Sequence, residues 1–285
     1  MITFQQALIE TTSRLRESGS ATPELDAMLL LAYATGKDRL SLYATPKQPL
    51  SAEQYALFEA LVGRREKAEP MAYILGEKGF WTLDLKVHKG VLIPRPDTET
   101  LVQTLLEKYP NKAAPLKICE LGVGTGAIIL SLLQEYPNAT GVGVDISPIA
   151  LACAAENATQ YHLEARLKLR ESAWFQNVPE NGFDSVVSNP PYIKTEDIPN
   201  LMRDVAHYEP ALALDGGADG LEAYRTIIAE TPNKLKVGGL LALEIGFEQA
   251  KDVQKLLKNS GHFGEVEVYK DLANHDRVIL ARLVQ

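Results

Sequence analysis

The chain has 285 residues, of which 46% are hydrophobic and 23% are charged, and its formal net charge is -8. This length allows a large buried core and two domains, and the ordinary balance of apolar and charged residues argues against a disordered chain. The acidic balance argues against a general binder of duplex nucleic acid, which needs excess Lys and Arg to neutralise phosphates.

Residues 1–75 are predicted to form a small helical bundle. Apolar residues recur at helical spacing from the N-terminus onward. A second helix is predicted to begin with Thr22 as its N-cap and Pro23 at its first position, and to end at Gly36. A third helix is predicted to begin at Ser51. Because no alternating strand pattern interrupts this part, a bundle is the expected arrangement.

Residues 76–95 are predicted to form a β-hairpin that links two domains. Apolar and polar residues alternate over 80–85 and again over 87–93. Near the start of the second segment, residues 88–90 have the sequence His-Lys-Gly, which is suited to a turn.

Residues 96–285 are predicted to form an α/β domain with a mostly parallel sheet. A helix over 98–108 comes first, with Asp97 as its cap. After it, predicted strands over 116–121, 140–145, 166–170, 183–188 and 239–245 alternate with helices over 126–136, 148–159, 220–235 and 248–258. Such alternation indicates parallel strands with helices on both faces. The last two strands, 265–270 and 277–283, have no helix between them, so an antiparallel strand at the C-terminal edge is expected.

The cysteines and the N-terminus predict a cytoplasmic protein. Cys119 and Cys153 lie in apolar stretches without a C-x-x-C spacing, so we expect buried thiols and no disulfide. The first residues lack the basic and apolar segments of a signal peptide. No run of about 18 apolar residues occurs, so no membrane association is expected.

A glycine-rich turn after the first predicted strand indicates a nucleotide-type ligand. The turn has the pattern G-x-G-x-G and opens a helix, and an acidic residue follows the next strand. The pattern differs from the G-x-G-x-x-G of dinucleotide sites, and an acid precedes the first glycine, where it could hold an ammonium group. These features favour S-adenosylmethionine over NAD. The predicted cofactor-binding residues are Glu120, Gly122, Val123, Gly124, Thr125, Gly126, Asp145, Trp174, which could stack on adenine, and Asn189.

The run Asn189-Pro190-Pro191-Tyr192 follows the fourth predicted strand of this domain and therefore lies beside the ligand. The Asn189 side chain and the Pro190 carbonyl are two acceptors, held rigidly because each proline fixes its own φ and restricts the preceding residue. Two fixed acceptors suit the two hydrogens of a planar –NH2 group, and Tyr192 could stack on that group. We therefore predict methyl transfer to a planar nitrogen, with Asn189, Pro190 and Tyr192 as catalytic residues.

Together these segments resemble the peptide chain release factor N(5)-glutamine methyltransferases, the PrmC/HemK family. The resemblance covers nearly the whole chain, including the block from Leu92 to Glu99, the glycine turn and the Asn-Pro-Pro-Tyr run. Three further blocks also resemble the family: Glu209-Pro210, Gly217 to Leu221, and Glu244-Ile245-Gly246. The chain departs from the family's usual residues at Glu120, at Val123-Gly124-Thr125 and at Asp97.

The resemblance implies a class I S-adenosylmethionine-dependent methyltransferase fold, Rossmann-like, with a helical domain that docks the substrate. A helical domain that only caps the catalytic domain is the other reading. It implies methylation of a glutamine amide in the Gly-Gly-Gln loop of release factors 1 and 2, with S-adenosyl-L-homocysteine as product. We expect a monomer with no metal and no direct nucleic-acid contact. The expected substrate-binding residues are Asn189, Pro190, Pro191, Tyr192, Arg95 and Glu99; an ion pair in the linker is the other reading of Arg95 and Glu99.

Four alternatives remain at this stage. A ribosomal-protein glutamine could be the substrate, or the enzyme could methylate adenine N(6) in nucleic acid, which would need a base-flipping pocket and a phosphate-binding surface. An NAD-dependent oxidoreductase would leave the Asn-Pro-Pro-Tyr run unused. A non-catalytic binding module would keep only the fold.

Overall fold

The computed structural model describes residues 2–284 and consists of two compact units. One unit extends to Glu77 and includes Met202–Tyr208, and the other contains Lys78–Leu201 and the chain from Glu209 onward. We call them the helical unit and the catalytic unit. No helix among residues 2–284 is both long and apolar enough to cross a membrane.

The helical unit is the bundle expected from the sequence, with three short helices that the sequence pattern did not predict, α3, α5 and α9. Its core contains Phe4, Leu30, Leu31, Phe58 and Val62. The predicted starts at Pro23 and after Ser51, and the end at Gly36, are confirmed. Its helices are α1 (Phe4–Glu17), α2 (Pro23–Thr35), α3 (Arg39–Ala44), α4 (Ala52–Glu66), α5 (Met71–Leu75) and, from the distant segment, α9 (Arg203–Tyr208).

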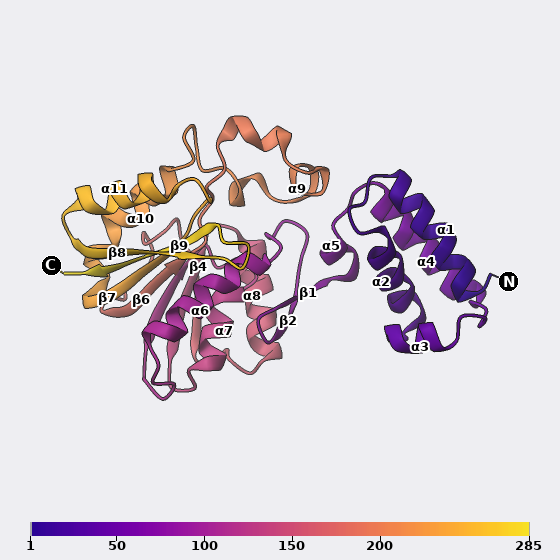
Figure 1. Ribbon diagram of the computed structural model, residues 1–285. Helices are drawn as coiled ribbons and strands as arrows, with labels where there is room; N and C mark the ends of the chain where they lie inside the picture. Colours follow the sequence, from indigo (N-terminus) through magenta and orange to yellow (C-terminus); the bar gives the residue numbers. More distant parts are fainter. Residues whose placement is uncertain (1, 285) are drawn as a thin grey trace. The chain divides into compact units, whose positions relative to one another are not determined.

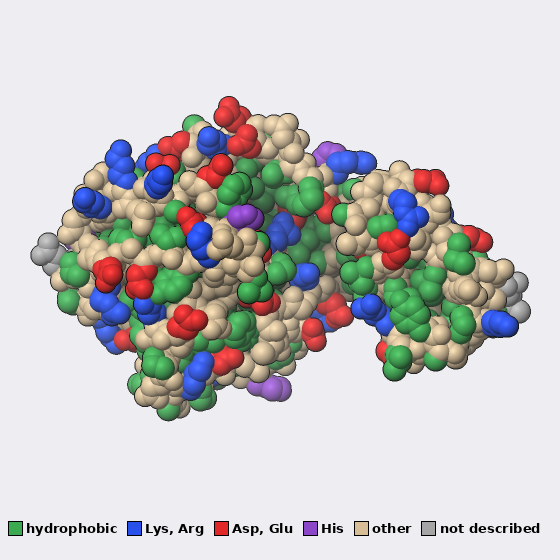
Figure 2. Space-filling view, viewed as in Figure 1, with side chains coloured by type: hydrophobic (Ala, Val, Ile, Leu, Met, Phe, Trp, Pro, Cys, Tyr) green, Lys and Arg blue, Asp and Glu red, His purple; other side chains and the backbone are tan. Residues whose placement is uncertain are grey.

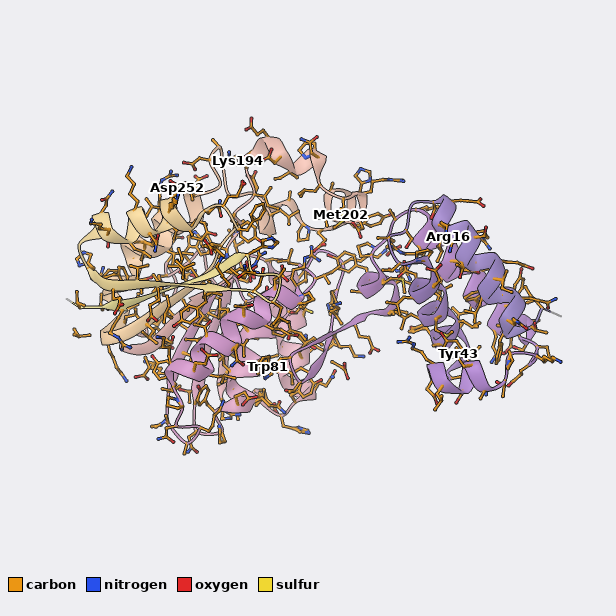
Figure 3. All side chains as sticks on the ribbon, in the orientation of Figure 1. Arg16, Tyr43, Trp81, Lys194, Met202 and Asp252 are labelled. Carbon is orange, nitrogen blue, oxygen red and sulfur yellow. The ribbon has the colours of Figure 1, made fainter. Side chains whose placement is uncertain are left out.

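The hairpin is real, but its predicted turn is wrong. Strands β1 (Glu77–Phe80) and β2 (Leu83–Lys86) pair around Trp81, whose φ is +55°, whereas residues 87–93 form no strand. The Trp81 amide donates to Glu99 Oε1 at 2.9 Å, and its indole donates to Glu135 Oε1 at 2.9 Å. Figure 3 labels the Trp81 side chain. These two contacts hold the turn against the helical layer of the catalytic unit, so tertiary contacts rather than local turn residues place it.

The predicted capping role of Asp97 is also wrong. A 3₁₀ turn, η1 (Pro96–Thr98), precedes α6 (Glu99–Lys108), and Thr98 occupies the N-cap position of α6. The Asp97 carboxylate instead lies 3.2 Å from a guanidinium nitrogen of Arg277. This distant cation could not be paired with Asp97 from the sequence.

A seven-stranded sheet in the order β5-β4-β3-β6-β7-β9-β8 forms the centre of the catalytic unit (Figure 1). All its pairs are parallel except those of β9 with β7 and β8. The predicted antiparallel C-terminal strand, β9, is confirmed; it lies between β7 and the edge strand β8. The strands are β3 (Lys117–Leu121), β4 (Thr140–Asp145), β5 (Leu167–Glu171), β6 (Phe183–Ser188), β7 (Leu235–Glu244), β8 (Phe263–Lys270) and β9 (Asp276–Leu283).

Helices cover both faces of this sheet. Figure 1 shows α10 (Glu222–Glu230) and α11 (Ala250–Ser260) on one face, with α6, α7 (Ala127–Glu135) and α8 (Pro148–Gln160) on the other. The predicted helix over 220–235 is shorter because Pro232 lies in the 3₁₀ turn η4 (Thr231–Asn233) that follows α10. No sequence pattern predicted the short 3₁₀ turns η2 (Thr195–Asn200) and η3 (Ala211–Ala213).

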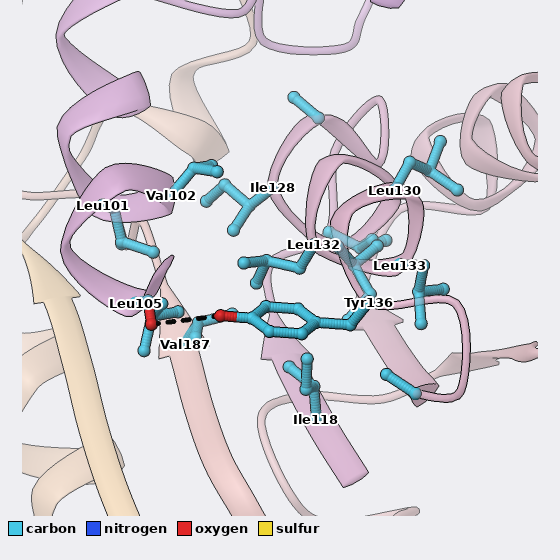
Figure 4. Close-up of a cluster of buried hydrophobic side chains, with 14 of the residues drawn as sticks. Leu101, Val102, Leu105, Ile118, Ile128, Leu130, Leu132, Leu133, Tyr136 and Val187 are labelled. Carbon is cyan, nitrogen blue, oxygen red and sulfur yellow. Dashed lines mark hydrogen bonds between the residues drawn. The ribbon is translucent and has the colours of Figure 1, made fainter. Parts of the chain in front are cut away.

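Two apolar layers hold the sheet between its helices. On the α6–α7 side, the buried Tyr136 ring lies among aliphatic side chains, and its hydroxyl donates weakly to the carbonyl of Leu105 at 3.4 Å (Figure 4). The same hydroxyl donates to the carbonyl of Tyr109 at 2.7 Å. Neighbouring residues of β3 belong to different layers: Ile118 faces this side, and Cys119 the other. This alternation is the period of two of a strand that is buried on both faces.

Candidate active site

The carboxyl ends of β3, β4 and β6 surround one cavity of about 390 Å³. The chain order reverses between β3 and β6, and ligands of open α/β sheets bind at such a switch point. The glycine turn follows β3, Asp145 ends β4, and Asn189 follows β6. The lining includes the predicted residues Glu120, Gly122, Val123, Gly124, Thr125, Asp145, Trp174, Asn189, Pro191 and Arg95.

The glycine turn leaves open space where side chains would otherwise stand. Gly122, Gly124 and Gly126 have φ values of +73°, +53° and +84°, a region that L side chains rarely adopt. A Cβ on Gly122 or Gly124 would meet no protein atom within 4 Å, and both residues line the cavity. At Gly126 a Cβ would lie 2.9 Å from Leu130 Cδ1, so this third glycine allows close packing of α7 rather than ligand approach.

Asp145 connects the glycine turn to the following loop. Its Oδ2 accepts from the Gly124 amide at 3.0 Å, and its Oδ1 accepts from the Ser147 amide at 2.9 Å. Burial raises the pKa of this carboxyl, although the two amides oppose the rise. Each carboxylate oxygen keeps further acceptor capacity that could serve ribose hydroxyls.

Glu120 makes a contact with the backbone of α7 that the sequence did not predict. Its Oε2 accepts from the Ile129 amide at 2.9 Å, so the carboxyl binds a free N–H in the first turn of α7. Burial raises the pKa of Glu120 well above its ordinary value, and the neighbouring charge of Asp145 adds to the rise. A buried carboxyl, that of Glu120, and the half-buried carboxyl of Asp145 border one cavity and favour a cationic ligand group. This electrostatic character, with the open glycine turn, fits S-adenosylmethionine.

Trp174 lies in the loop after β5 and lines the cavity. Its φ is +51°, which is uncommon for a bulky residue. The Ser172 hydroxyl donates to the Trp174 carbonyl at 2.8 Å and accepts from the Asn177 amide at 2.9 Å. These contacts hold the strained loop in place, an arrangement found at ligand sites.

Within the Asn-Pro-Pro-Tyr run, Asn189 and Pro191 line the cavity, whereas Pro190 and Tyr192 are not part of its lining. The Asn189 side-chain nitrogen donates to Thr98 Oγ1 at 3.2 Å. The Tyr192 hydroxyl lies 3.5 Å from Glu244 Oε1. The predicted roles of Pro190 and Tyr192 in binding and catalysis therefore stay predictions.

A second layer of residues clamps the backbone of Tyr192. The Gln249 side chain donates to the carbonyls of Tyr192 and Gly220, each at 3.0 Å, and accepts from the Gly246 amide at 2.9 Å. A Cβ on Gly216 would lie 2.8 Å from Tyr192 Cα, and one on Gly220 would lie 2.5 Å from the Tyr192 carbonyl oxygen. Glycine is therefore required at both positions because two backbone segments touch there.

The predicted residues Arg95 and Glu99 lie in different environments. Arg95 lines the cavity, and its guanidinium donates to the buried Glu209 Oε1 at 2.5 Å. Glu209 Oε2 also accepts from the Ile93 amide at 3.1 Å, so Glu209 holds the loop that borders the cavity. Glu99 is absent from the cavity lining and accepts from the Trp81 amide. Its predicted part in substrate binding stays a prediction.

Glu244 lies beneath Tyr192 and is almost fully buried, with 1% of its surface exposed. Burial raises the pKa of this carboxyl to about 7, a rise opposed by a hydrogen bond with the Thr98 hydroxyl and by the charge of Arg277. Among residues 2–284, no group donates a hydrogen bond to its Oε2. A buried carboxyl with an unpaired oxygen costs stability and therefore requires an explanation beyond packing.

Sequence reasoning did not assign four residues that support the site: Thr98, Glu209, Glu244 and Gln249. Glu209 and Glu244 belong to blocks that resemble the family, which was the available signal for them. Gln249 carried no signal, because only the fold brings it to the Tyr192 carbonyl.

Comparisons with known proteins agree with both units. Residues 6–76 match the family described as PrmC N-terminal domain, and residues 94–208 match the methyltransferase small domain. The chain is 44% identical to the release factor glutamine methyltransferase of Caulobacter vibrioides, over 98% of this chain and 96% of that protein. It is 41% identical to the protein of that name from Geobacter sulfurreducens, over 99% of this chain and 97% of that protein.

Solved structures with lower identity share the fold. The hMettl16 catalytic domain superposes with a TM-score of 0.58 at 13% identity, over 71% of this chain and 75% of that chain. The 16S rRNA N2 G1207 methyltransferase of T. thermophilus, solved with AdoMet and guanosine, gives 0.52 at 20% identity, over 73% of this chain and 49% of that chain.

Proposed function

Because the chain belongs to the release factor glutamine methyltransferase family, we propose that it methylates the side-chain amide nitrogen of the glutamine in the Gly-Gly-Gln loop of peptide chain release factors. The methyl donor is S-adenosylmethionine. One observation carries the proposal: the glycine turn, Asp145 and Asn189 meet at one cavity at the switch point of the sheet.

The residues of the cavity suit the parts of this cofactor. When bound, S-adenosylmethionine supplies a methyl group attached to a positively charged sulfur. Glu120 would face its amino group, Asp145 would accept from its ribose hydroxyls, and Trp174 would lie against its adenine. The open glycine turn allows the backbone to approach the ligand closely.

The polar contacts of Asn189 suit a glutamine amide as acceptor of the methyl group. The Asn189 nitrogen already donates to Thr98, which leaves the carbonyl oxygen to accept from the substrate –NH2. The Pro190 carbonyl would accept the second hydrogen. Two accepted hydrogen bonds increase electron density on a nitrogen whose lone pair is otherwise delocalised, so the chain contributes by positioning and electrostatics.

The helical unit would dock the release factor. Figure 2 shows hydrophobic side chains gathered on one face of this unit, and Figure 3 shows Tyr43 on its surface. The exposed large hydrophobic residues of this unit are Ile9, Leu25, Tyr33, Leu40, Tyr43, Tyr55 and Leu57 and, in the distant segment, Met202. A face on which exposed apolar side chains gather is typical of a protein-binding surface. Release factors 1 and 2 are the proposed partners. The cytoplasmic location and the monomeric state stay predictions.

The test is a methyl-transfer assay with labelled S-adenosylmethionine. In parallel reactions, the protein is incubated with a release factor, with ribosomal proteins and with duplex DNA. We expect label on the release factor, and none when its Gly-Gly-Gln glutamine is replaced by alanine. Label on DNA or on ribosomal proteins, but not on the release factor, would refute the proposed substrate.

A further inference from the structure

The two prolines of the Asn-Pro-Pro-Tyr run limit how this segment can be held in place. Pro190 and Pro191 have no N–H group, so neither can donate a backbone hydrogen bond. The Pro190 carbonyl must also stay free if it is to accept from the substrate –NH2. Contacts that fix the run without occupying this acceptor are found at the next two residues, Tyr192 and Ile193.

The side chain of Gln249, the residue before α11, supplies the contact at Tyr192. Its Nε2 donates to the carbonyls of Tyr192 and Gly220, each at 3.0 Å. Its Oε1 accepts from the Gly246 amide at 2.9 Å. Because a carbonyl can only accept and an N–H can only donate, these three bonds fix the orientation of the Gln249 amide. One side chain therefore ties together the segments that follow β6, precede α10 and follow β7.

The backbone of residues 214–220 packs directly against the run. The Ile193 carbonyl accepts from the Gly216 amide at 2.8 Å, and a Cβ on Gly216 would lie 2.8 Å from Tyr192 Cα. No side chain therefore fits between the two segments at this point. Gln249 bridges them, because it donates to one carbonyl of each.

We propose that Gln249 is a positioning residue for methyl transfer, which holds the Tyr192 backbone so that the two acceptors of the run meet the substrate amide. Those acceptors are the Asn189 side chain and the Pro190 carbonyl, and the inference rests on the proposed function. Gln249 does not line the cavity, so it acts only through the run. The proline rings fix φ and restrict the preceding residues, so a displacement of Tyr192 is passed on to both acceptors.

Gln249→Glu and Gln249→Met test this proposal in the full-length chain. The glutamate keeps an acceptor for the Gly246 amide, but it loses both donors and sets negative oxygens against two carbonyls. The methionine has a similar length and removes all three hydrogen bonds without adding a charge. It therefore carries the test if the glutamate variant does not fold. Gly216→Ala is an independent variant, because it leaves Gln249 intact and displaces Tyr192 by a direct clash.

Gln160→Glu and Gln160→Met are matched controls. Gln160, the last residue of α8, also donates to the backbone carbonyl of a distant segment, that of Asp84 at 2.9 Å. Neither Gln160 nor Asp84 lines the cavity. Each variant is assayed for kcat and KM with a release factor, and for S-adenosylmethionine affinity by calorimetry, at a temperature at which circular dichroism shows it to be folded.

We expect both Gln249 variants and Gly216→Ala to lower kcat about tenfold to hundredfold, the scale of a misplaced contact at a reacting group. Of the Gln249 pair, the glutamate should have the larger loss. The release-factor KM and the Kd of S-adenosylmethionine should each stay within about threefold of the wild-type values. The glycine turn and Asp145 are held by contacts that do not involve Gln249. The Gln160 variants should keep wild-type kcat.

Wild-type kcat in both Gln249 variants would overturn the proposal. A rise in the Kd of S-adenosylmethionine as large as the loss of kcat would also overturn it, as would an equal loss of kcat in the Gln160 variants. These outcomes are distinct from a failure of the proposed function, in which the wild-type protein itself would transfer no label to the release factor.

Discussion

Replacing Asp145 with asparagine should weaken S-adenosylmethionine binding almost as strongly as replacing it with alanine. Asp145 holds two backbone amides, with Oδ2 facing Gly124 and Oδ1 facing Ser147. An asparagine has one oxygen and one –NH2, so in either orientation a donor would face one of these N–H groups. The isosteric change therefore removes a contact and adds a repulsion in the turn that binds the cofactor.

The expected magnitude follows from these contacts. An N–H group left unpaired in a part-buried site costs about 1–3 kcal/mol. Because every 1.4 kcal/mol is a factor of ten in affinity, Kd should rise roughly tenfold to hundredfold in Asp145→Asn. Asp145→Ala should reach at least the upper end of this range, because it also removes both acceptors for the ribose.

Calorimetric titration with S-adenosylmethionine measures this directly. Asp184→Asn is a matched control, because Asp184 also accepts from a backbone amide, that of Lys117 at 2.8 Å, and from Lys236 Nζ at 2.7 Å. Asp184 lies at the start of β6, at the end of the strands away from the cavity. The Kd of Asp184→Asn should equal that of the wild-type protein. Wild-type affinity in Asp145→Asn would show that the turn does not need both oxygens and would refute this prediction.

Three further results are expected. Gly124→Ala should raise the Kd about tenfold and lower Tm slightly in calorimetry, because left-handed backbone costs an L residue about 1–2 kcal/mol and its methyl group would enter the cavity; a loss of stability alone would contradict this. Tyr136→Phe should lose about 1–2 kcal/mol of unfolding free energy in urea, with unchanged Kd, because the part-buried carbonyl of Tyr109 loses its donor. For Glu244, the folded state binds more protons than the unfolded state between pH 4.5 and about 7, so stability should fall by up to roughly 3 kcal/mol as the pH rises through this window. Thermal unfolding of Glu244→Gln at pH 5 and pH 8 should show a smaller fall, and an equal fall would refute this assignment.

Local patterns determined the element types, the class of fold and the centre of the site. Local sequence alone carries the helical and strand periodicities of the apolar residues. It also carries the prolines and the capping residues around Pro23 and Ser51. In a parallel sheet the carboxyl ends of the strands share one edge. The positions of the glycine turn, Asp145 and Asn189 directly after strands therefore predicted that they would meet.

Only the tertiary structure decided the contacts between residues that are distant in sequence. The turn of the hairpin lies at Trp81 because Glu99 and Glu135 bind this residue, and Asp97 pairs with Arg277 instead of capping a helix. In the same way, the orientation of the Asn189 amide depends on Thr98, which precedes it by 91 positions. Such pairings come from packing, which places side chains from separate elements in one polar network, and no local pattern in the sequence encodes them.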